Sequence, residues 1–541
     1  MRPKRNLPFY MLAALGLTVA VSGCAGDKGG GSASTAPTAG KTEANKPEER
    51  IKLKLFMSDS GVPVPNGTDP SNNEFINIVE DLANVDLDVE IPSYADFTTK
   101  YNLMLSSGNL PDIVHGTDTK VTDLRGDEGA FLDLKKYYDK SDTIKKVITP
   151  EMMELAKSDS GHNYRIPMNM TNQPQGRGVV VRYDLLVKYN EGKWPQTIDE
   201  WVEMMRKLKK AEPESVPLSN RLEGEKAFGG GGKTIFFWHG AMPFEYRVQN
   251  GKAISTFQLP EYKAAIELMK QLYDEGLLDK EFATNDNTRY ASRKSTKNTM
   301  FEMTNSDQLV PSAAAKPKNA EFIEWQWAPA LTRYPATLKD PKYALPYQGS
   351  PIGDSGLYIS KQSKDPDRAW RVIEAFASNE LSEAIFWGKE GVTYDVKDGK
   401  RVPIPEALRK QYWAINLALV WGFNGRVESN VAAAAQFLSK EELSRKLGGM
   451  KMLQEQAIQK GASLETFVTL TPEAVKKKSE ADAFISKTSV DAIMGKISMA
   501  EFDKKVEEFT KKFGFIYDEY TDYMKKNKDK LEKFGVKEVN W

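Results

Sequence analysis

Residues 51–55, Ile51-Lys52-Leu53-Lys54-Leu55, alternate strictly between apolar and basic side chains. A period of two is typical of a strand that buries one face. Three patterns follow in order: a helix with Phe75, Ile76, Val79 and Leu82 apolar, a strand with Val85, Leu87, Val89 and Ile91, and a helix with Phe97, Tyr101, Met104 and Leu105. A third strand begins in Leu110-Pro111-Asp112-Ile113-Val114. The order predicts a parallel α/β lobe.

A second α/β segment begins at Val179-Val180-Val181 and continues in an amphipathic helix from Ile198 to Leu208, with Thr197 at its N-cap. From about Asp367 onward helical patterns dominate. One of them has Phe502, Val506, Phe509 and Phe513 at spacings of four, three and four. The sequence therefore predicts two α/β lobes and a helical C-terminal region.

The first residues have the form of a secretory leader. A basic start is followed by the short apolar run from Phe9 to Val21, which is too short for a stable membrane span. Val21-Ser22-Gly23-Cys24 resembles a bacterial lipobox, and Cys24 is the single cysteine of the chain. We expect removal of residues 1–23, lipidation of Cys24 and a flexible linker over residues 24–50. The alternative is an ordinary secreted protein with a chance cysteine.

Charge and composition narrow the classes of function. The chain has 75 basic and 75 acidic residues, and loss of the three basic residues of the leader leaves 72 against 75. This balance argues against nucleic-acid binding and against a polybasic membrane grip, so the lipid is the expected membrane attachment. The three histidines, His115, His162 and His239, are far apart in sequence, which argues against a zinc site. We expect no metal and no cofactor.

Several segments resemble the family 1 extracellular solute-binding proteins of ABC importers, in particular the large lipoprotein subgroup of Gram-positive bacteria. The segments are Ser106-Ser107-Gly108-Asn109-Leu110-Pro111-Asp112-Ile113, Gly161-His162-Asn163-Tyr164-Arg165-Ile166-Pro167, Arg182-Tyr183-Asp184-Leu185-Leu186, Trp194-Pro195-Gln196-Thr197-Ile198-Asp199-Glu200-Trp201, Tyr273-Asp274-Glu275-Gly276-Leu277-Leu278-Asp279, Ile359-Ser360-Lys361 and Gly388-Lys389-Glu390-Gly391-Val392-Thr393-Tyr394. Each is weak alone, but their order and spacing are specific.

The resemblance implies an α/β, two-lobed periplasmic-binding-protein-like fold of type II with a cleft between the lobes. Segments 51–172 and 295–348 would form the N-terminal lobe, and segments 178–290 and 355–541 the C-terminal lobe with its helical extension. Some relatives carry a calcium loop after the Arg182-Tyr183-Asp184 element. Here Tyr189-Asn190-Glu191-Gly192-Lys193-Trp194 is too poor in carboxylates for that ion.

The resemblance also implies a function. It predicts a lipid-anchored, extracytoplasmic, monomeric receptor that captures an oligosaccharide by closing and delivers it to ABC importer permeases. A secreted glycoside hydrolase or lyase is the enzyme alternative, since it needs only two suitably spaced carboxylates. A peptide-binding or sensory surface receptor would share the same fold.

Sugar binding calls for aromatic platforms flanked by polar groups, because sugars present C–H faces bounded by hydroxyls. The aromatic candidates stand beside Gly, Asn or His in predicted loops: Trp238, Trp387 and Trp421. Core packing is the alternative for each, and it is preferred for Trp325 and Trp327. The polar candidates follow or precede predicted strands: Asp59, Asn305, Asp307 and Asp354. Turn stabilisation is the alternative for these four.

A glycine-rich run, Phe228-Gly229-Gly230-Gly231-Gly232-Lys233-Thr234, resembles a phosphate-binding loop. The first glycine of that motif would fall on Ala227, and the preceding residues are mostly charged and form no apolar strand. We therefore predict a flexible loop near the ligand site, with no nucleotide.

Overall fold

The structure, a computed structural model, describes residues 48–60, 62–170, 176–224, 226–305, 325–348, 350–422, 431–432, 435, 438–459 and 463–541. The predictions for the leader, for Cys24, for most of the linker and for Asp307 lie outside these residues. Residues 49–541 form one compact unit.

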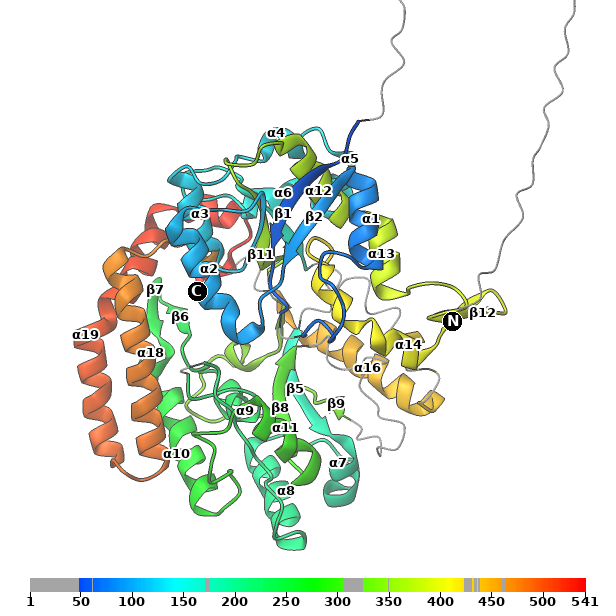
Figure 1. Ribbon diagram of the computed structural model, residues 1–541. Coiled ribbons are helices and arrows are strands. Elements are labelled where there is room, and N and C mark those ends of the chain that lie inside the picture. Colours follow the sequence, from blue (N-terminus) through cyan, green and yellow to red (C-terminus); the bar gives the residue numbers. More distant parts are fainter. Residues whose placement is uncertain are drawn as a thin grey trace, which may run out of the picture. The chain divides into compact units, whose positions relative to one another are not determined.

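The first sheet has the strand order β2-β1-β3-β11-β4. Its strands are β1 Ile51–Phe56, β2 Val85–Glu90, β3 Ile113–Gly116, β4 Arg165–Asn169 and β11 Ile352–Ile359. β1 pairs in parallel with β2 and β3, and β11 runs antiparallel between β3 and β4. Figure 1 shows β1 and β2 beside α1. The first lobe is defined here as this sheet and the helices that cover it.

The second sheet has the order β14-β10-β5-β8, with β9 also paired to β5. Its strands are β5 Gly176–Arg182, β8 Phe301–Asn305, β9 Trp325–Trp327, β10 Tyr347–Gln348 and β14 Ile458–Gln459. The second lobe is this sheet with the helices around it. Two hairpins complete the strands: β6 Tyr246–Gln249 with β7 Lys252–Ser255, and β12 Tyr394–Lys397 with β13 Lys400–Pro403.

Helices connect the strands of both lobes. Those of the first lobe are α1 Glu74–Ala83, α2 Tyr94–Ser107, α3 Thr119–Asp127, α4 Lys135–Tyr138, α5 Asp142–Val147, α6 Pro150–Leu155, α12 Pro366–Phe376, α13 Asn379–Phe386, α14 Pro405–Lys410 and the 3-10 turn η4 Tyr412–Leu417. Those of the second lobe are α7 Tyr183–Asn190, α8 Ile198–Ala211, α9 Gly231–Trp238, η1 Thr256–Gln258, α10 Pro260–Asp274, α11 Asn287–Thr296, η3 Pro341–Ala344, α16 Lys440–Gln456, α17 Leu464–Phe467, α18 Pro472–Ile493, α19 Met499–Lys526, α20 Lys528–Lys533 and η5 Lys537–Asn540.

Local sequence signals account for these elements. The Asn73 side chain caps α1 by accepting from the amides of Phe75 and Ile76, and α1 ends at Asn84 in the left-handed conformation. Thr197 caps α8 by accepting from the Glu200 amide, as expected. β2 alternates between buried and exposed residues, which is the pattern its sequence predicts.

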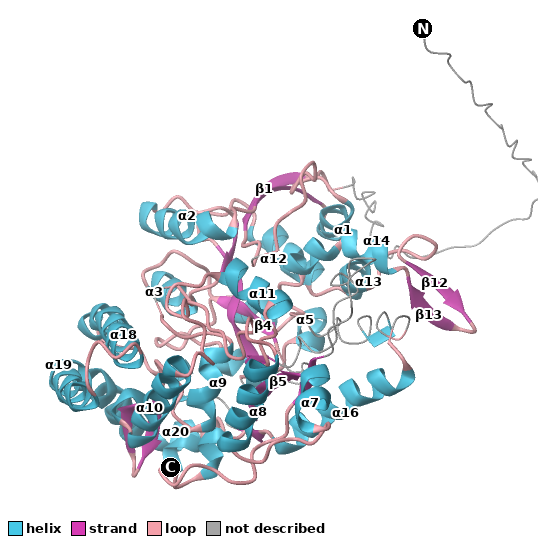
Figure 2. Cartoon of the chain, turned by 90° about the horizontal axis from the view of Figure 1, so that it is seen from below, coloured by secondary structure: helices cyan, strands magenta, loops and turns pink. Residues whose placement is uncertain are grey.

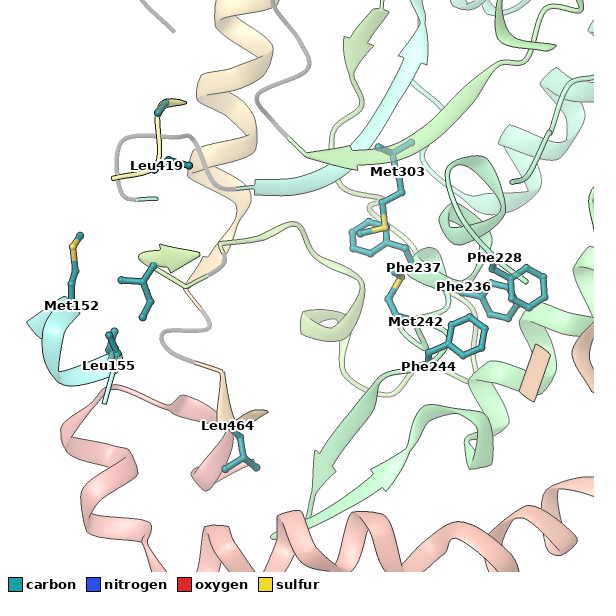
Figure 3. Close-up of a cluster of buried hydrophobic side chains, with 14 of the residues drawn as sticks. Met152, Leu155, Phe228, Phe236, Phe237, Met242, Phe244, Met303, Leu419 and Leu464 are labelled. Carbon is teal, nitrogen blue, oxygen red and sulfur yellow. The ribbon is translucent and has the colours of Figure 1, made fainter. Parts of the chain in front are cut away.

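The apolar side chains form three clusters that cover both faces of the two sheets. The largest extends through both lobes, and Figure 3 shows Phe228, Phe236 and Phe244 grouped within it. A second lies under α2 and α3, and a third holds Val180 and Trp327 beneath α16. Burial of both faces explains why β5 contains the continuous apolar run Val179-Val180-Val181.

The predicted helical C-terminal region is present. α18 and α19 lie side by side, α18 packs on α10, and α19 packs on β7 (Figures 1 and 2). In α19 the buried side of the helix includes Phe502, Phe509 and Phe513. Within the described residues, no helix combines the length and apolar composition required to cross a membrane.

The division of the chain between the lobes differs from the expected one. Segment 295–348 was assigned to the N-terminal lobe, but β8, β9 and β10 lie in the second sheet with β5. Within segment 355–541, β11 pairs with β3 and β4, and α12 packs on α1 of the first lobe. The cause is strand pairing between residues more than a hundred positions apart, which local patterns do not encode. The two-lobed α/β architecture itself is confirmed.

Candidate functional site

The chain passes between the two sheets three times. It crosses from β4 to β5, from β10 to β11, and a third time between Gly422 and α16. On the first-lobe side the Asn169 amide donates to the Val420 carbonyl over 2.8 Å, and the Met170 amide to the Pro351 carbonyl over 2.9 Å. On the second-lobe side β10 pairs with β5. The described ends of the three crossings therefore meet on the first-lobe side, and we take their surroundings as the candidate site.

Asp59 follows β1 in the first lobe and is buried, with 4% exposure. Its backbone carbonyl accepts from the Val62 amide, which closes a tight turn. The Asn416 side chain of η4 donates to the Val62 carbonyl over 2.7 Å. Since η4 leads directly to Val420, this contact ties the turn that contains Asp59 to the third crossing.

Asp354 lies at a β-bulge of β11. The register of β11 against β4 shifts between Ile352 and Gly356. Bulges re-aim side chains at the ends of sheets, and here Asp354 is exposed. A Cβ at position 356 would lie 2.7 Å from the Ile166 carbonyl oxygen, so only glycine fits beside the bulge.

Trp421 lies at the third crossing and is half-buried. Its ring nitrogen donates to the Ala377 carbonyl over 3.0 Å, which fixes the orientation of the ring. The next residue, Gly422, has a φ of +58°, and a Cβ there would lie 2.4 Å from the Asn169 carbonyl oxygen. This close approach holds Trp421 beside β4.

Asn305 is the last residue of β8 and pairs with Arg177, next to the pair of Gly176 with Gln348. It therefore lies at the end of the second sheet where the chain crosses over. Asp354, Trp421 and the backbone of Asn305 thus lie beside described ends of the crossings, and the turn that contains Asp59 is linked to the third crossing through Asn416.

Trp238 and Trp387 are not at the crossings. Trp238 is 3% exposed, stacks on Trp201 with ring centroids 5.5 Å apart and contacts Phe301 at 5.0 Å, so its ring is buried among core aromatic residues. Trp387 is 5% exposed, with Tyr394 against its edge and Arg401 over its ring. In this conformation neither ring has a free face for a ligand.

A group of buried polar side chains near the first sheet was not singled out by the sequence. His115 precedes the last residue of β3 and is 2% exposed, and neither ring nitrogen has a hydrogen-bond partner among the described residues. Burial lowers its pKa to about 4. The available signal is its position, since a histidine within a strand that is otherwise buried and apolar is unusual.

Asp123 of α3 contacts Tyr358 of β11, which pairs with Arg165 of β4. The Tyr358 hydroxyl donates to the Asp123 carboxylate over 2.8 Å, and burial raises the pKa of Asp123 to about 6. Arg165 is 5% exposed, and its Nε and Nη1 atoms have no acceptor in the described part of the chain. The first lobe therefore holds buried polar atoms without a hydrogen-bond partner among the described residues, on His115 and Arg165.

The other two histidines have hydrogen-bond partners, His239 in the core and His162 at the surface. His239 shares a hydrogen bond of 2.7 Å with the Ile235 carbonyl, and His162 pairs with Asp133 over 2.7 Å. Over the described residues, no three His, Cys, Asp or Glu side chains gather in a way that could hold a metal ion. In the turn compared above with a calcium loop, Glu191 pairs with Lys193 over 2.6 Å.

The glycine-rich run differs from the predicted flexible loop. Gly229 to Gly232 are buried, and Gly231 and Gly232 begin α9. The Gly229 amide donates to the Asn220 side chain over 3.0 Å, and the Gly231 amide to the Tyr290 hydroxyl over 2.9 Å. A Cβ at position 231 or 232 would lie within 2.4 Å of a neighbouring oxygen. These glycines therefore permit close packing, and two of their amides are already occupied.

The comparisons with known proteins agree with this geometry. The model of the bacterial extracellular solute-binding protein family matches residues 70–382, which is more than half of the 541 residues. The chain belongs to the bacterial extracellular solute-binding proteins. Two relatives of this family member come from Bacillus subtilis (strain 168). Lipoprotein LipO is 25% identical over 260 residues, which are 47% of this chain and 49% of LipO.

The second, the polygalacturonan/rhamnogalacturonan-binding protein YtcQ, is 26% identical over 249 residues, covering 45% of this chain and 47% of YtcQ. This solute-binding protein therefore spans about half the length of the curated relatives it matches. Its fold is similar to that of FusA, an ABC-transporter substrate-binding protein of Streptococcus pneumoniae solved with kestose. The TM-score is 0.64 at 18% identity, over 88% of this chain and 100% of FusA.

Proposed function

We propose that this protein is a lipid-anchored, extracytoplasmic receptor that captures an oligosaccharide and delivers it to the permeases of an ABC importer. The observation that carries the proposal is the set of three crossings between two lobes, with Asp354, Trp421 and Asn305 around them. Crossings of this kind are where hinge closure around a ligand takes place. Membership of the solute-binding family supports the same function.

The anchor is proposed from the sequence. The lipobox-like segment Val21-Ser22-Gly23-Cys24 supplies the thiol, and one relative is itself named a lipoprotein. Each buried methylene of an acyl chain adds about 0.8 kcal/mol of membrane affinity, so two chains hold a soluble body stably at the surface. Residues 24–50 then act as the tether, and the receptor works as a monomer.

An oligosaccharide is the proposed ligand because of the chemistry around the crossings. Trp421 can offer an aromatic face to the C–H face of a sugar ring, and Asp354 can accept hydrogen bonds from its hydroxyls. Asp59 and Asn305 stay candidate partners because of their positions after β1 and at the end of β8. YtcQ is named as a binder of polygalacturonan and rhamnogalacturonan, and FusA was solved with kestose. The saccharide class of this receptor is therefore sought first among plant pectin and fructan oligomers.

Binding and closure are coupled in this proposal. The saccharide contacts one lobe in the open form and both lobes in the closed form. Only the difference between its affinities for the two forms shifts the population towards closure. The closed form then docks on the permeases, and the saccharide is released without bond cleavage.

A thermal-shift screen tests the proposal. The Cys24→Ser chain, which has no lipid attachment, is incubated with galacturonate oligomers, fructo-oligosaccharides and bacterial glycans, with peptides as controls. A ligand at 100 times its dissociation constant adds about 2.7 kcal/mol to the folded state, which raises the melting temperature. The expected result is a shift by one saccharide class, with the saccharide recovered intact.

Two outcomes would contradict the proposal. Recovery of cleaved saccharide with new reducing ends would indicate a glycoside hydrolase or lyase. A shift by peptides alone would indicate a peptide-binding or sensory receptor, and the sugar assignment would then be wrong.

A further inference from the structure

The short segment η3 leads into the second crossing, and its Tyr343 packs against Trp541. The Tyr343 ring meets the Trp541 ring edge to face, with centroids 5.7 Å apart and planes at 88°. The Nζ of Lys342 lies 4.8 Å from the centroid of the Trp541 ring. Trp541 is fixed in turn, because its carbonyl accepts from the Gly251 amide over 3.0 Å. The contacts join η3 to the β6–β7 hairpin of the second lobe.

A buried arginine, Arg247, also contacts the Tyr343 ring. The Cζ of Arg247 lies 4.2 Å from the centroid of the Tyr343 ring, and the Tyr343 hydroxyl donates to the Val248 carbonyl over 3.1 Å. The Arg247 side chain is 5% exposed and pairs with Glu261 over 2.7 Å. It also donates to the Gly240 carbonyl over 2.7 Å. The Tyr343 ring therefore contacts both a buried ion pair and an aromatic ring.

The position of η3 gives these contacts a mechanical consequence. η3 ends at Ala344, β10 begins at Tyr347 in the second sheet, and β11 begins at Ile352 in the first sheet. Hinges are a few residues at the ends of elements that absorb the backbone rotation. With η3 and β10 fixed to the second lobe, the residues from Pro341 to Gln348 take no part in this rotation.

We propose that Trp541, Tyr343 and Arg247 form a hinge clamp, which positions the second crossing and so narrows the range of lobe orientations. These are positioning residues that act on the ligand site through the crossing. The inference rests on the proposed function, because lobe closure is the motion that the hinge clamp restricts. Its loss is expected to broaden the lobe orientations in the absence of any ligand.

The experiment needs no ligand. Ser106→Cys on α2 and Lys207→Cys on α8 are labelled with a fluorophore pair in the full chain that carries Cys24→Ser, so that no other cysteine is present. Single-molecule energy transfer gives the distribution of lobe separations. Hydrogen exchange of the peptide 341–348 reports local opening of η3 and β10.

Trp541→Ala is the test variant. We expect a broader distribution of energy transfer and roughly tenfold faster exchange in peptide 341–348, since one aromatic pair and one cation–π contact are lost. Trp370→Ala is the matched control, because it removes a stacked pair with Tyr137 in the first lobe, 5.3 Å between centroids. The control should lower the melting temperature and leave both readouts unchanged.

The hinge clamp is overturned if Trp541→Ala lowers stability as the control does, with an unchanged distribution and unchanged exchange. Should Trp541→Ala fail to fold, Tyr343→Phe and Lys342→Gln provide the same test. Tyr343→Phe keeps the contacts of the ring with Trp541 and Arg247 but loses the bond to Val248. Lys342→Gln loses the cation over the Trp541 and Tyr343 rings together with the ion pair to Asp340. Both should accelerate exchange in peptide 341–348 relative to the wild type, and unchanged exchange in both would overturn the hinge clamp. The proposed function would fail separately, in the saccharide screen, whatever this experiment shows.

Discussion

Substitution of Gly422 by alanine tests whether the crossings pack as closely as described. The residue has a φ of +58°, and a Cβ there would lie 2.4 Å from the Asn169 carbonyl oxygen, whereas ordinary contact begins at 3.4 Å. The two segments must therefore separate by about 1.0 Å, the difference between 3.4 and 2.4 Å. The left-handed backbone costs about 1 kcal/mol for alanine, and overpacking costs about 1–3 kcal/mol. Gly422→Ala should therefore lose about 2–4 kcal/mol.

Gly276→Ala separates the cost of the left-handed backbone from the cost of overpacking. Gly276 has a φ of +69° and nothing within 4 Å of an added Cβ, so it carries only the backbone cost of about 1 kcal/mol. Urea titrations of both variants give the two free energies of unfolding, and saccharide affinity reports the effect on the site. Gly422→Ala should also weaken saccharide binding, since it displaces Trp421 from β4. Equal losses of unfolding free energy in the two variants would show that a Cβ at position 422 meets no steric conflict with Asn169.

Three further predictions follow from buried and exposed charges. The folded-state pKa of His115 is about 4, below its ordinary 6.5, so the folded protein binds this proton more weakly than the unfolded chain. Relative to His115→Leu, the wild type should lose about 3 kcal/mol between pH 7 and pH 4 in urea titrations, and parallel curves would contradict this. Arg247→Ala should cost about 3–5 kcal/mol, because it leaves Glu261 buried without its cation, whereas Lys270→Ala in an exposed pair should cost under about 1 kcal/mol. Similar losses of unfolding free energy for Arg247→Ala and Lys270→Ala, measured by urea titration, would show that burial of the ion pair does not increase the cost of removing its cation. Asp354→Ala should leave the melting temperature unchanged and lower saccharide affinity in titration calorimetry, and unchanged affinity would remove Asp354 from the site.

Local patterns predicted the elements well. The strand expected at 51–55 is β1, the helix around Val79 is α1, and the Thr197 cap begins α8. These signals depend on neighbours within a few residues, which is why the sequence contains them. The lobe assignment of β8 and β11 could not be predicted in this way. Their partners β5 and β3 are over a hundred residues distant, and a resemblance to fold alone did not fix the pairing.

The sequence could indicate only part of the candidate site for a similar reason. Asp354 and Asn305 lie in strands whose ends adjoin the crossings, and their part in ligand binding stays a prediction. Trp238 and Trp387 are candidates because of their glycine and histidine neighbours. Both pack in the core, because burial of a large aromatic ring stabilises the folded state. His115 and Arg165 were not chosen because each stands in an ordinary strand, and only the fold shows that their polar atoms have no partner among the described residues.

Closure of the two lobes on a bound saccharide is tested most directly by small-angle X-ray scattering. The Cys24→Ser chain is measured with and without the saccharide that gives the largest thermal shift. We expect a smaller radius of gyration in the complex, because the ligand stabilises the closed arrangement of the two lobes. We also expect the saccharide to be recovered intact from the same sample. An unchanged radius of gyration with the saccharide bound, or recovery of cleaved saccharide, would contradict the receptor mechanism.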